Sequence, residues 1–121
     1  MADNTAGQTR TTSVDQNTVG QFAAGKIVYD ATAITATDYT RVETGFKPTR
    51  ISFLNLTDRV GLEWYEGMTA SQNLKTVAAG TRTLDTTASG VVVDDKGFRI
   101  LQDATLAVVL ASKTIYWRAI G

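Results

Sequence analysis

The chain has 121 residues, the size of one domain, and its twelve basic and twelve acidic side chains leave no net charge. Cysteine and histidine are absent, which excludes disulfides, thiolate nucleophiles and Cys-based zinc sites and removes the commonest acid–base catalyst near neutral pH. A neutral chain also lacks the basic character typical of proteins that bind nucleic acid or anionic membranes. We therefore expect no enzyme, no cofactor, no nucleic-acid partner and no membrane partner.

The composition favours strands. Twenty residues are threonine and only one is proline. Threonine is stiff at χ1 and fits a pleated sheet, and the ten glycines can supply turns. An all-β fold is predicted.

Residues 1–24 differ from the remainder because they are polar and have no hydrophobic period. Val14, Val19 and Phe22 are their main large apolar side chains. We interpret this segment as a flexible or extended N-terminal arm, followed by a single β-domain over residues 25–121. Either the arm is a terminus without a role, or it becomes ordered on a neighbouring subunit. Its removal up to residue 20 is predicted to leave the domain nearly as stable but to weaken its self-association or its attachment to an assembly.

The first residues show no basic segment followed by an apolar one, so no secretory signal is expected. No apolar run approaches the roughly 20 residues of a membrane-spanning helix. These observations predict a protein that is made and kept in the cytoplasm unless something else exports it.

From residue 26 onward, short β-rich segments alternate with turns. Residues 60–66 alternate most clearly, with Val60, Leu62 and Trp64 on one face. In residues 49–56 the period shifts at the end, where Leu54 and Leu56 join Ile51 and Phe53 as core candidates. The expected strands cover residues 26–30, 39–44, 49–56, 60–66, 81–86, 90–93, 98–101, 105–110 and 113–119. This spacing indicates a sandwich, a jelly roll or a small barrel, and among these we favour an antiparallel β-sandwich of jelly-roll type.

Two hairpins are predicted at the end of the chain. Residues 94–97 form a turn between strands, with Gly97 in a left-handed conformation. Residues 105–110 and 113–119 form the clearest hairpin, joined at 111–112. The predicted core comprises Ile51, Phe53, Leu62, Trp64, Val92, Phe98, Leu106, Val108, Ile115 and Trp117.

Two groups of carboxylates could form a reactive or a metal-binding site. Glu63 and Glu66 stand three apart in a strand, so they point to opposite faces and do not converge as a glycosidase pair must. Asp94, Asp95 and Asp103 supply too few closely spaced oxygens for a calcium loop, and turn chemistry explains the first two. No catalytic, cofactor-binding or metal-ligating residue is predicted.

Two aromatic pairs are the most informative feature. Neighbouring strand residues face opposite ways, so one ring of each pair is buried and the other points outward. Trp64 and Trp117 share faces with core residues, which leaves Tyr65 and Tyr116 outside. Outward rings are either ordinary surface or anchors of an interface, where tyrosine is enriched. The candidate interface residues are Val14, Val19, Phe22, Tyr65 and Tyr116.

Three segments carry a resemblance to a known family. They are NLTDRVGLEWYEGM (residues 55–68), TVAAGTRTL (76–84) and TIYWRA (114–119). Over residues 46–121 the chain resembles the small cement or decoration proteins that coat the heads of tailed bacteriophages. The resemblance implies a β-rich homo-oligomer on the capsid exterior whose partner is the major capsid protein. It carries over no functional residue.

The leading hypothesis is accordingly a virion structural protein that stabilises the capsid lattice. The alternative is a carbohydrate- or receptor-binding β-module of a phage tail or fibre. A binding module should have a concave site with clustered aromatic and polar groups, whereas a cement protein should have a flat interface and a protruding arm.

Overall fold

The computed structural model describes residues 7, 10–17, 21–68, 72–87 and 89–121, with the backbone alone for 10–17. These residues form ten strands and one short 3₁₀ helix, and no α-helix. The strands are β1 (Arg10–Asn17), β2 (Phe22–Tyr29), β3 (Tyr39–Glu43), β4 (Arg50–Asn55), β5 (Val60–Tyr65), β6 (Asn73–Thr76), β7 (Arg82–Asp85), β8 (Val91–Asp94), β9 (Gly97–Leu101) and β10 (Thr114–Ile120). The all-β prediction is confirmed.

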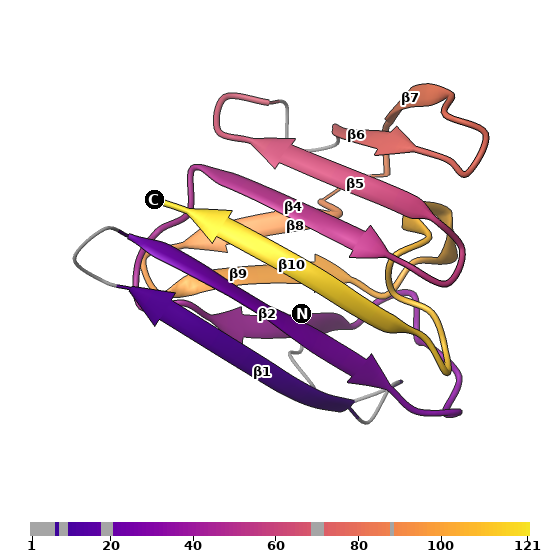
Figure 1. The fold of residues 1–121 in the computed structure, drawn as a ribbon, viewed down its shortest axis with the longest axis horizontal. Helices are drawn as coiled ribbons and strands as arrows, with labels where there is room; N and C mark the ends of the chain where they lie inside the picture. The colour runs from indigo at the N-terminus through magenta and orange to yellow at the C-terminus, as the bar shows by residue number, and fades with distance from the viewer. Residues whose placement is uncertain (1–6, 8–9, 18–20, 69–71, 88) are drawn as a thin grey trace.

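Two antiparallel sheets pack face to face. The larger has seven strands in the order β1-β2-β10-β4-β5-β6-β7, and the smaller has three in the order β3-β9-β8. In Figure 1 the larger sheet faces the viewer and β8 and β9 lie behind it. This is a β-sandwich, as predicted. A jelly roll builds eight strands from two Greek keys, and the division into seven and three does not confirm that finer expectation.

Alternation in the central strands places the core between the sheets. The ring of Phe98 on β9 lies edge-to-face against Phe53 of β4 and Trp117 of β10, at centroid distances of 5.5 and 5.3 Å. Of the ten predicted core residues, nine are buried and Val92 is only partly buried. Val92 pairs with Arg99, and its neighbour Val91 takes the inward position.

The end of β4 corrects the predicted shift in period. Leu54 and Leu56 are exposed, whereas Asn55 is fully buried, so strict alternation continues. The Asn55 side-chain Nδ2 donates hydrogen bonds to Asp58 Oδ2 (2.8 Å) and to the Ala107 carbonyl (3.0 Å). A polar residue takes the inward position because its hydrogen bonds are satisfied there.

The predicted hairpin of residues 105–110 and 113–119 is wrong. Residues Ala104–Leu106 form the 3₁₀ helix, which Asp103 caps, and Ala107 has a φ of +62° that interrupts any strand. β10 instead pairs with β2 on one side and β4 on the other. Leu106, Val108 and Val109 are fully buried, so the apolar run fills the core as a loop. Burial was correctly inferred from hydrophobicity, but strand conformation was not.

The turn between β8 and β9 forms where predicted, but a side-chain hydrogen bond rather than a left-handed glycine stabilises it. The Asp94 carboxylate accepts hydrogen bonds from the backbone N–H groups of Lys96 (2.9 Å) and Gly97 (3.0 Å). Gly97 does not adopt a positive φ. Glycine is required because a Cβ there would overlap the Val42 carbonyl of the adjacent β3.

The N-terminal segment differs from the predicted arm. β1 pairs with β2 along its whole length, from Arg10 opposite Tyr29 to Asn17 opposite Phe22. The boundary expected between residues 24 and 25 falls inside β2, which also pairs with β10. A polar segment can join a sheet at its edge through backbone hydrogen bonds alone, so hydrophobic period does not reveal such a strand.

Candidate functional surface

The outer face of the seven-stranded sheet is the candidate site. The smaller sheet covers its inner face, and strand register aligns the outward side chains in rows. One row runs Lys26, Tyr116, Leu54, Gly61, Thr76 and Arg82; the next runs Ala24, Arg118, Ser52, Glu63, Leu74 and Leu84; a third runs Phe22, Ile120, Arg50 and Tyr65. Seven strands spaced by about 4.8 Å extend roughly 29 Å, the width of a standard protein interface.

Exposed apolar side chains are concentrated on this face. Six large hydrophobic residues are exposed in the part of the chain that the structure describes, and five of them point outward from this sheet. They are Phe22, Val28, Leu54, Leu84 and Tyr116. The sixth, Leu56, directly follows β4. Apolar groups gathered on one face typify an interaction site, whereas single scattered ones do not.

The prediction that Tyr116 and Tyr65 point outward is confirmed. Tyr116 is 44% exposed, whereas its neighbour Trp117 is 3% exposed. Tyr65 lies on the same face but is half-buried. Its hydroxyl donates a hydrogen bond to Glu63 Oε1 (2.9 Å), and the Arg50 guanidinium lies over its ring at 5.2 Å from the centroid. Tyr65 is thus held in place by its neighbours, while Tyr116 is open to a partner.

The other predicted interface residues have different outcomes. Phe22 is exposed and lies in the same row as Tyr65. Val14 lies in β1 opposite Gly25, and its side chain is outside the described part of the structure. Val19 lies outside the described residues. The face therefore brings together three of the five predicted side chains.

A shallow depression lies between β4 and β10 on this face. It has a volume of about 270 Å³ and is lined by Ser52, Phe53, Leu54, Tyr116, Trp117 and Arg118. Ser52 lies directly opposite Arg118, between Leu54 and the larger Arg50 on its own strand. The small serine side chain leaves the space that its larger neighbours border.

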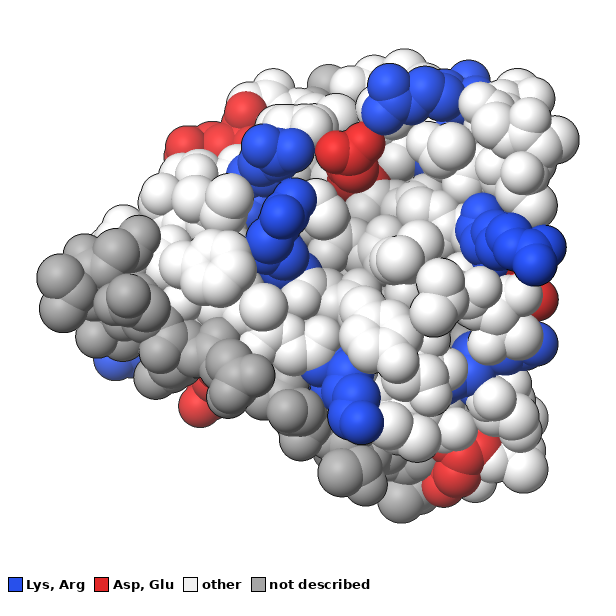
Figure 2. Space-filling view, viewed as in Figure 1, with Lys and Arg blue, Asp and Glu red and all other residues white. Residues whose placement is uncertain are grey.

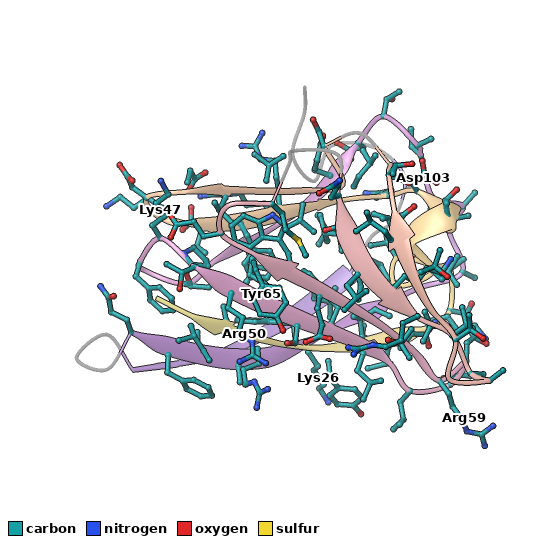
Figure 3. All side chains as sticks on the ribbon, turned by 90° about the horizontal axis from the view of Figure 1, so that it is seen from above. Lys26, Lys47, Arg50, Arg59, Tyr65 and Asp103 are labelled. Atoms are coloured by element: carbon teal, nitrogen blue, oxygen red, sulfur yellow. The ribbon has the colours of Figure 1, made fainter. Side chains whose placement is uncertain are left out.

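Charged side chains surround the apolar groups. Figure 2 shows a mostly uncharged surface with several basic side chains and fewer acidic ones. Lys26, Arg50, Arg82 and Arg118 lie in the outward rows, with Glu63 as the acidic member. In Figure 3, Lys26, Arg50 and Tyr65 lie on the side of the larger sheet, while Lys47 lies on the side of the smaller one.

Sequence reasoning missed Lys26, Leu54, Arg50 and Arg118 as members of this surface. Alternation within residues 113–119 places Arg118 on the same face as Tyr116. The position of β10 between β2 and β4 is what brings Lys26 and Leu54 beside them. Local sequence carries no signal for that long-range pairing.

No cluster of three or more acidic, histidine or cysteine side chains suited to a metal ion exists among the described residues. Within the same residues, no helix is long and apolar enough to cross a membrane. Comparison of the chain with protein-family models, with curated proteins and with solved structures gave no match.

Proposed function

We propose that this chain is a virion structural protein that binds the outer surface of a bacteriophage head and holds neighbouring major capsid subunits together. The main observation that supports this proposal is that exposed apolar side chains lie together on one broad sheet face. Such a face suits docking onto another protein and requires no catalysis. The resemblance of residues 46–121 to head decoration proteins supports the same role.

The outer face of the larger sheet suits a protein that makes many individually weak contacts with a lattice. An open sheet face presents a few anchors, chiefly Phe22, Leu54 and Tyr116, beside a shallow depression. On a lattice, many copies and contacts linked through self-association gain strength by avidity. Within the described residues, the edge strands β1 and β7 each have one neighbour in the sheet, and such an edge can pair with another copy.

Heads of the encoding phage that lack the chain would test this proposal. The purified protein should bind them in many copies, as measured by cosedimentation and quantitative gel analysis. Replacing Leu54 with Ser together with Tyr116 with Ala should abolish most binding, since these anchors are adjacent across β4 and β10. Lys47→Ala, on the other side of the molecule, is the control. Attachment of only a few copies, or to tails alone, would contradict the proposal.

One observation favours the second candidate, a carbohydrate- or receptor-binding module. The depression between β4 and β10 combines the Tyr116 ring with the polar side chains of Ser52 and Arg118. An aromatic ring beside hydrogen-bonding groups is a usual lining for a small ligand. Glycan-array binding that Tyr116→Ala abolishes, without any binding to heads, would favour this candidate.

A further inference from the structure

The charge of the docking face differs from that of the whole chain. The chain is neutral, with twelve basic and twelve acidic side chains. Among the side chains that the structure describes, which exclude those of β1, the outward rows carry four cations, Lys26, Arg50, Arg82 and Arg118, against the single carboxylate of Glu63. Positive charge is therefore concentrated where the exposed apolar side chains lie.

Glu63 does not neutralise the centre of the face. Its Oε2 pairs with Arg82 Nη2 at 2.9 Å, and its Oε1 accepts the Tyr65 hydroxyl and lies 3.9 Å from Arg50 Nη2. Lys26 and Arg118 are exposed and form no ion pair in the described part of the chain. Lys26 on β2 lies directly across from Tyr116 on β10, and Arg118 follows Tyr116 by two residues on β10. Two unpaired cations thus flank the main aromatic anchor.

We propose that this face docks onto an acidic protein surface, whose carboxylates pair with Lys26 and Arg118 while its apolar groups contact Leu54 and Tyr116. The inference rests on the proposed function in taking the face as a docking surface, and it adds the chemistry of the partner. Complementary charge would steer the encounter and fix the orientation of each copy.

A second copy of the chain does not fit this face. In a two-fold symmetric contact the same patch meets itself, so one net positive patch would meet another. Like charges brought together at an interface oppose association. Self-association is therefore expected at the sheet edges rather than here.

A nucleic acid fits less well than a protein. Single-stranded nucleic acids bind to sheets on which bases stack against open aromatic faces. Here Arg50 covers the Tyr65 ring, and Val28, Leu54 and Leu84 supply aliphatic rather than aromatic surface. Aliphatic groups beside cations match a protein surface that carries both carboxylates and apolar side chains.

Titration of the isotopically labelled full chain can test the chemistry without any capsid. The probe is a capped oligoglutamate peptide, with the matching oligoglutamine peptide as control. Amide shifts should be confined to β2, β4 and β10 and should vanish in Lys26→Glu/Arg118→Glu. Lys47→Glu should leave them unchanged. Shifts elsewhere, no shifts, or tighter binding of oligothymidylate or anionic vesicles than of oligoglutamate would overturn the proposal.

Binding to heads separates this proposal from the proposed function. Lys26→Glu/Arg118→Glu should weaken binding on the order of tenfold, and added salt should weaken binding of the wild-type chain. Spectra of the folded variant confirm that its structure is intact. Binding that is insensitive to salt and to charge reversal would overturn the acidic partner while the proposed function stands. If the chain failed to bind heads while oligoglutamate still shifted the amides of this face, the proposed function would be overturned and the acidic partner would stand.

Discussion

The two faces of the seven-stranded sheet are built from the same strands, yet one face is buried in the core and the other is exposed. On β10, Ile115, Trp117 and Ala119 are buried against the smaller sheet, whereas Tyr116 and Arg118 are exposed. β4 repeats the arrangement, with Ile51 and Phe53 inside and Leu54 outside. Alternate residues of one strand therefore lie in the core and on the proposed docking face. A substitution at an inward position should lower stability, whereas one at an outward position should leave stability nearly unchanged.

The sharpest test compares two neighbours on β10. Trp117→Ala should lower the free energy of unfolding by about 3–5 kcal/mol, because it removes a buried ring that packs against Phe98. Tyr116→Ala should cost less than about 1 kcal/mol, since the ring is exposed. Under the proposed function, this variant should weaken binding instead. Urea unfolding of both variants measures the difference. Equal destabilisation would show that the outer face belongs to the core.

The edge of the sheet provides a second test. Deleting residues 1–20 removes β1, which pairs with β2 along its length, so we expect a loss of roughly 2–4 kcal/mol. This expectation replaces the earlier one, drawn from the sequence, that the deletion is nearly neutral. The uncovered edge of β2 should also promote self-association, which sedimentation velocity detects. Unchanged stability would restore the interpretation of the segment as a separate arm.

A third test uses the inward polar residue of β4. Asn55→Ala leaves the Ala107 carbonyl and the Asp58 N–H without their partner, at a cost of about 1–3 kcal/mol. Leu54→Ala, one residue away and exposed, should cost less than about 1 kcal/mol. Chemical unfolding of the two variants gives the comparison. A costlier Leu54 variant would contradict the division between the faces.

Alternation within strands made much of this predictable. It placed Trp64 and Trp117 inside and Tyr65 and Tyr116 outside, because each assignment depends only on neighbouring residues. Pairing between distant segments was not predictable. The sequence does not reveal that β10 lies between β2 and β4, nor that β1 lies at the edge. The cationic character of the face follows from that order, so it became visible only in the structure.

The outer face of the smaller sheet shows the contrasting case, in which a cation is paired internally. There Arg41 binds Asp94 through both guanidinium nitrogens, while Lys26 and Arg118 on the larger sheet form no ion pair in the described part of the chain. The pair does leave Asp94 44% exposed, so its net contribution to stability is under about 1 kcal/mol. Its expected effect on stability is therefore as small as that of the exposed residues Leu54 and Tyr116.

The Asp94 pair should nevertheless be visible in the pH dependence of stability. The hydrogen-bonded Arg41 guanidinium, helped by the Lys96 and Gly97 backbone N–H groups, lowers the pKa of Asp94 below its ordinary 3.8, against the opposing effect of burial. Because the folded-state pKa is the lower one, the stabilisation is present above pH 3.8 and is lost as the pH falls through the folded-state pKa. Asp94→Asn should therefore flatten the acid side of a plot of Tm against pH. If the Asp94→Asn variant kept the wild-type slope, the Arg41 pair would contribute nothing to stability in solution.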